Sequence, residues 1–395
     1  DKRVTHTEPR SEDPLQDAFS LMVRLALERG ASSLHLGPCY TPEAAGAVSW
    51  LRCRVNGVLE PVAPLDNRLV APLIAYWKKA AACYAAETSV AQDGRIVLAS
   101  GNSPETAQLV DVLVSFLPTS LGERMTARFL DEREFKKRLN DLGMEESDRQ
   151  RVKQALRQRS RMVVLSGASG SDRDTILASL LREVAGPQIN LMTLGCPAWQ
   201  AIPWASVVSL SSLGQSRSYA VGVHTMLRSD PDVIGLGNLP DEETVRASQE
   251  AVLRGALVLA AMNGHGAIST LRSLVEMSSP PLLLAQTLEL LVSQRFLRTL
   301  CPCCAQANTP DALAIERLHE AAQRGGLSAQ DFKAEFKAPT GCSACGGSGY
   351  QGRTLVFETL PVSARLINLI ASGAGDDSLS KEAAGLGLTS LDAKA

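Results

Sequence analysis

The feature that most constrains the fold is a series of short apolar segments between residues 162 and 262. Stretches whose apolar residues recur at helical spacing separate these segments. Continuous apolar runs are typical of strands buried on both faces, and their alternation with helices indicates a mostly parallel sheet covered on each side. The expected strands are Met162–Leu165, Asn190–Leu194, Val207–Leu210, Val233–Leu236 and Leu257–Met262, with a helix at Thr175–Val184 after the first.

Residues 14–130 have a different pattern, in which short strands accompany two helices. Apolar residues from Pro14 to Arg29 recur at helical spacing, and Gly30 ends that helix. A second helix is expected from Arg68 to Ala85. The expected strands are Leu34–Leu36, Val48–Val55, Arg95–Leu98 and Val110–Phe116. This part is therefore predicted to be an α+β domain.

The chain has 395 residues, which at about 150 residues per domain suggests two or three domains. Residues 131–161 are dense in mixed charge, and we interpret them as a linker followed by a solvated amphipathic helix. The polar start lacks Met, so we expect a further domain before Asp1. The predicted divisions are a disordered tail 1–13, an α+β domain 14–130, a linker 131–147, an α/β domain 148–300, a four-cysteine segment 301–354 and a helical tail 355–395.

Composition excludes several classes of function. Lys and Arg number 40 against 42 Asp and Glu, so bulk charge gives no argument for binding nucleic acid or an anionic membrane. Aromatic residues make up 4% of the chain, too few for a base-stacking surface. No apolar run approaches the roughly 18 residues of a membrane helix. An odd number of cysteines without a signal peptide indicates a reducing compartment, and we expect a cytoplasmic protein that does not insert into the membrane.

The segment GASGSDRDT, residues 167–175, stands where a phosphate-binding loop would join the first strand to its helix. The pattern G-x-x-x-x-G-K-[ST] supplies backbone N–H groups, an ammonium and a hydroxyl for magnesium. Here Asp172, Arg173 and Asp174 replace its Gly, Lys and Ser/Thr. Two like charges about 4 Å apart repel by about 4 kcal/mol at an effective dielectric of about 20, so both acids oppose phosphate.

Two interpretations of this segment stay open. It is either an altered nucleotide site or an ordinary Gly/Ser turn that opens a helix. The residues of the candidate nucleotide site are Gly167, Gly170, Ser171, Asp172, Arg173, Asp174 and Thr175.

Several strings, in order along the chain, carry a resemblance to a known family. They are RGASSLHLGP (29–38), LRCRVNGVLEP (51–61), QDGR (92–95), VSFLPTSLGERMTARFL (114–130), LRSDPDVIGLGNLPD (227–241) and GCSACGGSGYQGRT (341–354). On these strings the chain resembles the ATPases of type II secretion and type IV pilus assembly, which are cytoplasmic hexameric motors. The resemblance covers nearly everything from Pro14 onward. It implies a RecA-like (P-loop NTPase-type) α/β domain, an α+β domain before it and a zinc-containing helical subdomain after it.

The chain departs from this family at the residues that carry its chemistry. The family's acidic box matches Gly195 and Cys196, so both of its carboxylates are absent. The glutamate that ends the family's Walker B segment matches Asn238, and an amide cannot act as a base. The family's histidine near the γ-phosphate matches Asn263. Together with the altered loop, these changes predict a retained scaffold whose own site does not hydrolyse ATP and disfavours ATP and magnesium.

Some basic residues of the N-terminal domain are retained. The resemblance implies that Arg52, Arg54 and Arg128 point toward the nucleotide of a neighbouring subunit, where they would complete a neighbour's site. Leu113 stands where the family has a further arginine. The alternative is that Arg52 and Arg54 are strand residues on a solvated face.

The cysteines near the C-terminus form two C-x-x-C pairs, Cys301 with Cys304 and Cys342 with Cys345. Two such pairs offer four thiolates, which suits a structural tetrahedral zinc. Cys303 lies beside the first pair and competes with Cys304 as a ligand in this prediction. The alternative is four reduced thiols. The remaining cysteines, Cys39, Cys53, Cys83 and Cys196, are expected to be small buried apolar residues.

The function expected from these features is that of a degenerate motor subunit. It would serve as a structural or regulatory partner of a type II secretion or type IV pilus machine, in a hexamer-type ring with itself or with an active paralogue. Inner-membrane platform proteins are the other expected partners, which would place the chain peripherally at that membrane.

Two alternatives remain within the same family. In an ATPase with a rewired site, Asp174 would bind magnesium, Arg173 would hold phosphate, and Asp93 or Glu123 would supply a carboxylate. In a nucleotide-sensing switch, the site would bind nucleotide without hydrolysing it.

Overall fold

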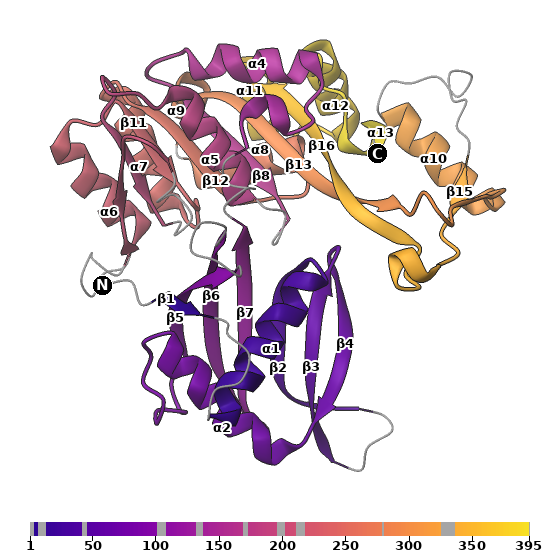
Figure 1. The fold of residues 1–395 in the computed structure, drawn as a ribbon. Helices are drawn as coiled ribbons and strands as arrows, with labels where there is room; N and C mark the ends of the chain where they lie inside the picture. Colours follow the sequence, from indigo (N-terminus) through magenta and orange to yellow (C-terminus); the bar gives the residue numbers. More distant parts are fainter. Residues whose placement is uncertain are drawn as a thin grey trace. The chain divides into compact units, whose positions relative to one another are not determined.

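Figure 1 shows the fold of the chain in a computed structural model. The structure describes residues 4–6, 13–41, 46–100, 108–131, 137–168, 173–195, 202–210, 218–278, 280–324 and 336–394. The chain forms two compact units, Asp1–Glu134 and Phe135–Ala395. The division between them falls inside the segment 131–147 that the sequence predicts as a linker. The finer divisions at 147/148 and 300/301 stay predictions.

The first unit is built on a seven-stranded sheet with the strand order β1-β5-β6-β7-β2-β3-β4. Neighbouring strands are antiparallel except for β1 and β5, which are parallel. The strands are β1 Val4–His6, β2 Ala31–Tyr40, β3 Ala47–Val55, β4 Val58–Leu65, β5 Gln92–Ser100, β6 Gln108–Thr119 and β7 Gly122–Asp131. The helices are α1 Pro14–Glu28 and α2 Asn67–Ala80.

Both helices cover the same face of this sheet. The Asp13 carboxylate caps α1 by accepting a hydrogen bond from the Leu15 N–H at 2.9 Å. Phe19 of α1 packs on Trp77 of α2, with ring centroids 4.5 Å apart. Apolar side chains of β2, β3, β5, β6 and β7 are buried in the same core. Because successive side chains of a strand alternate, the residues between them point to the opposite face, which neither described helix of this unit covers.

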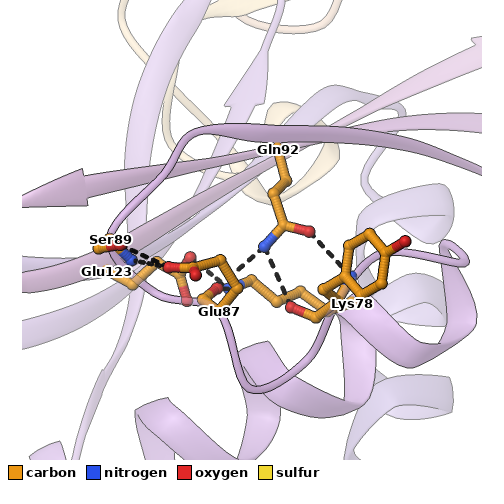
Figure 2. Close-up of polar contacts among 6 residues, drawn as sticks. Lys78, Glu87, Ser89, Gln92 and Glu123 are labelled. Carbon is orange, nitrogen blue, oxygen red and sulfur yellow. Dashed lines mark hydrogen bonds and ion pairs between the residues drawn. The ribbon is translucent and has the colours of Figure 1, made fainter.

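The helix α2 ends at Ala80 instead of the predicted Ala85, because its last turn enters a polar network (Figure 2). Lys78 is fully buried, and its Nζ lies 2.6 Å from the Glu123 carboxylate of β7. The same ammonium donates to the backbone carbonyl of Glu87. The lysine thereby holds the chain after α2 in a loop that runs to β5.

The Gln92 side chain secures that loop from the other side (Figure 2). Its amide oxygen accepts from the Tyr84 N–H at 2.8 Å, and its amide nitrogen donates to the carbonyls of Tyr84 and Glu87 at 3.0 and 2.9 Å. The helical pattern of the sequence continues past Ala80, but these side-chain bonds give the backbone other partners.

The second unit is built on another seven-stranded sheet, with the order β10-β9-β11-β12-β8-β13-β16. Neighbours from β10 to β13 in this order are parallel, and β16 is antiparallel to β13. The strands are β8 Met162–Gly167, β9 Leu191–Leu194, β10 Ala205–Val208, β11 Val233–Leu236, β12 Leu257–Asn263, β13 Leu288–Leu300 and β16 Tyr350–Pro361. The mostly parallel sheet predicted from the apolar runs is confirmed.

Helices lie between and after these strands, and none of those described is both long and apolar enough to cross a bilayer. They are α4 Glu146–Leu156, α5 Arg173–Val184, α6 Tyr219–Met226, α7 Glu242–Leu253, α8 Ala267–Met277, α9 Pro281–Thr287, α10 Ala312–Arg324, α11 Ala364–Ala371, α12 Asp376–Gly385 and α13 Leu391–Lys394. Shorter pieces are η1 Leu139–Asp141, η4 Leu227–Ser229, β14 Gln306–Ala307, β15 Lys337–Ala338 and η5 Ser343–Cys345.

The predicted helical tail 355–395 begins with a strand, because β16 spans the expected boundary between Thr354 and Leu355. The antiparallel partner of β16 is β13, which the sequence patterns did not predict either. The ends of these two strands that lie within the sheet are buried, and their other ends continue as a two-stranded ribbon toward the cysteine segment (Figure 1). Helices α11, α12 and α13 follow.

Part of the charged segment 131–161 is packed inside the second unit. Leu139, Leu142, Val152 and Leu156, its apolar anchors, are all buried. Asp148 of α4 is also buried, and it accepts a hydrogen bond from the Thr359 hydroxyl of β16 at 2.6 Å. The described residues from 137 onward therefore include the predicted amphipathic helix, and its apolar side is packed in the second unit.

Candidate functional site

The predicted nucleotide site lies at the carboxyl edge of the second sheet. Parallel strands bring their carboxyl ends to one edge, where α/β sheets bind ligands. Gly167 ends β8 and pairs in register with Asn263, which ends β12. Gly195 follows β9, and Asn238 follows β11 after Gly237, whose N–H donates to the Leu194 carbonyl at 2.9 Å. The structure thus gathers these predicted positions along four adjacent strands.

The helix α5 begins at Arg173 after the strand β8, as a helix after a phosphate-binding loop would. Asp174 occupies its first turn, and Thr175 is buried. The N-terminus of a helix attracts anions. The negative charge of Asp174 therefore lies at the end of α5 where a bound phosphate would be most strongly attracted by the helix dipole. The remaining predicted residues of this site, Gly170, Ser171, Asp172 and Cys196, lie outside the described residues.

Gly195 is held in a conformation that leaves no room for a side chain. Its φ is +89°, in the region that favours glycine. Tyr219, the first residue of α6, donates from its hydroxyl to the Gly195 carbonyl at 3.4 Å. A Cβ added to Gly195 would lie 2.2 Å from that hydroxyl and 2.5 Å from the ring. The phenol therefore stands where a side chain at residue 195 would begin.

The other two edge positions carry amides. The residues on both sides of Asn238 are fixed by backbone hydrogen bonds. The Gly237 N–H donates to the Leu194 carbonyl of β9, and the Leu239 N–H donates to the Ala261 carbonyl of β12, each at 2.9 Å. Asn263 is exposed at the end of β12. An amide neither accepts a proton at neutral pH nor carries the charge that holds magnesium. For binding an anion, this edge offers the N-terminus of α5 and the Arg173 guanidinium. Where a general base or a metal-binding carboxylate would act, it has the amides of Asn238 and Asn263.

A candidate metal centre is formed by Cys301, Cys304, Cys342 and Cys345, whose sulfurs all lie within 4.8 Å of one another. The Sγ atoms of Cys301 and Cys342 are 3.9 Å apart, and those of Cys304 and Cys345 are 3.8 Å apart. Tetrahedral zinc with bonds of about 2.3 Å needs sulfurs about 3.8 Å apart, whereas a disulfide needs about 2.05 Å. The donor set and its spacing therefore fit a zinc ion.

The surroundings of the cysteines favour the thiolate form on one side of the cluster. The N–H groups of Cys342 and Gly349 donate to the Cys345 sulfur at 3.2 and 3.1 Å. These bonds lower the pKa of Cys345 to about 6, whereas burial raises the pKa of Cys301 to about 12. Cys303 is exposed and does not belong to the cluster, so Cys304 is the candidate ligand of that pair.

The three predicted arginines lie together on the first unit. The strand register places Arg52 of β3 opposite His35 of β2. It places Arg54 of β3 and Arg128 of β7 on either side of Ser33 of β2. The three arginines therefore share one face of the sheet with Ser33 and His35. This is the face that α1 and α2 leave uncovered. Arg124 joins the group, because it lies on β7 in the same alternation as Arg128 and its guanidinium lies 3.3 Å from the His35 Nδ1.

His35 lies at the centre of these guanidiniums and is buried. Its Nε2 lies 3.0 Å from the Ser33 hydroxyl, and its Nδ1 lies 3.3 Å from the Thr126 hydroxyl as well as from Arg124. Burial, together with the charges of Arg124 and the other three arginines, lowers the pKa of His35 to about 4. The ring is therefore neutral at pH 7 and accepts from Arg124 through Nδ1.

Sequence reasoning missed His35, Arg124 and the Lys78–Glu123 ion pair. The alternation of polar residues at 33 and 35, 52 and 54, and 124, 126 and 128 would have indicated the shared face. Of the carboxylates named for a rewired site, Glu123 is paired with Lys78, and Asp93 accepts from the Ser115 hydroxyl at 2.7 Å.

Comparisons with known proteins agree over most of the chain. Residues 8–393 match the family described as type II/IV secretion system protein. The type II secretion system ATPase E of Vibrio cholerae is 30% identical over 381 residues, which are 95% of this chain and 70% of that protein. The structure of the ATPase DotB of Legionella pneumophila aligns with a TM-score of 0.62 at 17% identity, covering 99% of this chain and 94% of the other. The pilus retraction motor PilT with bound ADP aligns with a TM-score of 0.54 at 17% identity, covering 94% and 88%. These structures confirm the predicted RecA-like fold class.

Proposed function

The chain belongs to the type II/IV secretion system protein family, and from this premise we propose that it is a motor subunit that does not hydrolyse ATP at its own site. It serves instead as a structural or regulatory subunit of a type II secretion or type IV pilus machine. The family resemblance covers the scaffold, whereas the departures fall on the residues that would perform phosphoryl transfer.

The observation that carries this proposal is the contact between Gly195 and Tyr219. The family's acidic box would place a carboxylate at residue 195, and the Tyr219 hydroxyl occupies the space of its Cβ. Asn238 stands in place of the Walker B glutamate, and Asp174 puts a negative charge at the start of α5. Phosphoryl transfer depends on positioned metal and charge, and loss of one such group costs about two to three orders of magnitude in rate.

We further propose that zinc has a structural role at the four cysteines. Four protein sulfurs leave no open position for a substrate. The centre joins the chain after β13 to the chain before β16, because Cys301 follows β13 directly and the second pair precedes Tyr350. Bound zinc would fix the far end of this ribbon, and the cysteines would hold it as thiolates.

The proposed partners are an active motor paralogue, or copies of this chain, in a hexamer-type ring, and the platform proteins of the inner membrane. The names of the similar proteins support this setting, since one is a secretion-system ATPase and another a pilus retraction motor. The chain would then act in the cytoplasm, peripheral to the inner membrane.

Two measurements on the full zinc-loaded chain test the proposal. We expect ATP turnover with magnesium to equal the background, and we expect no rise in the melting temperature with ATP, since a ligand that binds the folded state raises its stability. Arg173→Ala is the control that assigns any turnover to the loop. Turnover above background that Arg173→Ala abolishes would contradict the proposal.

A second candidate is a nucleotide-sensing switch. The helix N-terminus after β8 and the retained cation Arg173 favour it, because both attract phosphate. A rise in melting temperature with ATP but without turnover would identify the switch.

A further inference from the structure

The short helix α13 connects the two faces of the second sheet. It packs beside β16, an edge strand whose only strand partner among the described residues is β13 (Figure 1). Glu358 and Thr359 are successive residues of β16, so their side chains point to opposite faces of the sheet. The helix α13 bonds to the Glu358 carboxylate on one face and to a partner of the Thr359 hydroxyl on the other. It therefore passes over the free edge of β16.

On the first face, the Glu358 carboxylate is shared between the first residues of two helices. It is 4% exposed, and it accepts hydrogen bonds from the Ala267 N–H of α8 and, at 2.8 Å, from the Leu391 N–H of α13. Hydrogen bonds to a charged acceptor are stronger than those between neutral groups. A Cβ added to Gly266 would lie 3.1 Å from the Glu358 Oε1. Because residues 263–266 follow β12 at the carboxyl edge, Glu358 connects that edge to α13.

On the second face, Lys394 of α13 is held by two acids of α4. Its ammonium contacts the Asp148 carboxylate and lies 2.8 Å from that of Glu145. The Asp148 side chain is 3% exposed and accepts from the Thr359 hydroxyl at 2.6 Å. Without Lys394, this buried charge would depend on Arg151, which is 3.6 Å away, so removal of the ammonium is costly.

We propose that α13 is a strap that couples the carboxyl edge after β12 to the helix α4. The edge backbone, Glu358, α13 and Asp148 form one continuous series of hydrogen bonds to buried carboxylates. Movement of α13 disturbs both ends of the series, because Glu358 and Asp148 each lose a donor. The helix α4 follows the division between the two units, so the strap carries a change at the edge toward the linker.

The size of α13 gives this element two discrete states. It has four residues, and helices shorter than about 12 residues are marginal in water on their own. Its docking depends on the two charged contacts and on the Leu391 side chain, which is 3% exposed. A docked state and a released state are what coupling between two sites requires. The inference goes beyond the proposed function, because it holds whether or not nucleotide binds at the edge.

Hydrogen exchange of the full chain, followed by mass spectrometry, tests the coupling in one direction. Lys394→Ala should speed the exchange of residues 264–270 by about 2- to 30-fold, the range in which residues along such a network change coupling, although Lys394 does not contact them. The exchange of residues 257–262 in the core of β12 should stay unchanged, which verifies the fold. Arg365→Ala is the matched control, because it breaks an exposed ion pair with Glu382 that lies outside the series.

The opposite direction uses a change at the edge. Gly266→Ala should press on the Glu358 carboxylate and speed the exchange of residues 146–156 in α4 by a similar factor, since coupling between two sites is reciprocal. Gly375→Ala adds the same methyl group where nothing lies within 4 Å, and it should leave that exchange unchanged.

A milder variant protects the test against a loss of folding in Lys394→Ala. The Glu145 side chain is 61% exposed, so Glu145→Gln weakens the hold on Lys394 without leaving a buried charge unpaired. It should give the pattern of Lys394→Ala with a smaller amplitude. Faster exchange at Leu391 without any change in residues 264–270, or no response of α4 to Gly266→Ala, would show that α13 is a local anchor and would overturn the inference.

Discussion

Gly195 and Tyr219 bear most directly on what the carboxyl edge of the second sheet can hold. The missing carboxylate at residue 195 is visible in the sequence, but its replacement by a phenol ring is not. Tyr219 is separated from Gly195 by 24 residues, and only the packing of α6 beside β9 brings the two together. Restoring an acid at residue 195 alone would therefore not restore a site.

The pairing predicts a non-additive effect on stability. Gly195→Ala should cost about 1–2 kcal/mol because φ is positive, and about 1–3 kcal/mol more because the methyl meets the ring. Adding Tyr219→Ala should remove the second part, which gives a coupling of about 1–3 kcal/mol in a double-mutant cycle. Scanning calorimetry of the four proteins measures it. Gly186→Ala, where nothing lies within 4 Å, is the control, and additivity of the two changes would contradict the steric argument.

Lys78 and Glu123 form a second residue pair that is structural in our interpretation. Lys78→Met should destabilise the first unit by about 3–5 kcal/mol, because Glu123 would remain as an uncompensated, nearly buried charge. The double change Lys78→Met with Glu123→Gln should recover much of this loss. Lys79→Met changes the exposed neighbour and should lie within about 0.5 kcal/mol of the native chain. The melting temperatures of the three variants and the native chain measure these effects. A mild effect of Lys78→Met would contradict the structural role of the Lys78–Glu123 ion pair.

At the level of elements, the strands predicted from continuous apolar runs were found, because strands buried on both faces leave a clear pattern. The exception is the edge strand β10, which is only partly buried and ends at Val208 instead of the predicted Leu210. The strands β13 and β16 were missed because each changes environment along its length. Leu291 is buried within the sheet, whereas Arg298 is exposed on the ribbon and stacks on the Tyr350 ring, 3.8 Å from its centroid. The cysteine spacing, in contrast, predicted which four sulfurs come together, because the geometry of each C-x-x-C pair is local.

Removal of zinc should loosen this ribbon. We expect the chain to retain about one zinc per molecule after dialysis and Cys345→Ser to lower the zinc affinity at least tenfold, since thiolate ligands hold the ion. The chelated protein should melt at a lower temperature. Cys303→Ser is the matched control because that thiol is exposed and outside the cluster. Full zinc retention by Cys345→Ser would exclude this residue as a ligand.

The short helix α13 depends on a buried ion pair with α4. Lys394 contacts the Asp148 carboxylate and lies 2.8 Å from that of Glu145, and its side chain is 8% exposed. Burial works to lower the pKa of Lys394, but the hydrogen bonds to both carboxylates prevail and raise it. A raised pKa stabilises the contact at every pH below the usual value for lysine, and this contribution is lost as the pH rises through the folded-state value.

Lys394→Ala should therefore release α13 at neutral pH. The Leu391 N–H, which donates to the Glu358 carboxylate at 2.8 Å, should exchange with solvent at least tenfold faster. Hydrogen exchange followed by mass spectrometry measures this at peptide level. Lys381→Ala, on the exposed face of α12, should leave the exchange unchanged. Equal exchange in both variants would show that α13 is held by other contacts.

For the whole molecule, a net charge of −2 conceals a strongly uneven distribution. Four arginines lie on one face of the first unit, while Asp174 lies in the first turn of α5 in the second. The sequence alone could predict the family, the parallel sheet and the cluster of four cysteines, since these depend on local or continuous patterns. The convergence on His35 could not be predicted from spacing, because it needs β7 to pair with β2, which lies in a distant part of the chain beside β3.

This distribution predicts how assembly responds to nucleotide. Because the chain's own edge is expected not to bind ATP, the size of its assemblies should be the same with and without ATP and magnesium. A mixture with an intact motor subunit should instead shift to a larger, mixed ring when ATP is added, since the family resemblance implies that Arg52, Arg54 and Arg128 then reach that subunit's nucleotide. Sedimentation velocity of each chain and of the mixture measures the response. An ATP-dependent size change in this chain alone, removed by Arg173→Ala, would show that its edge still binds nucleotide.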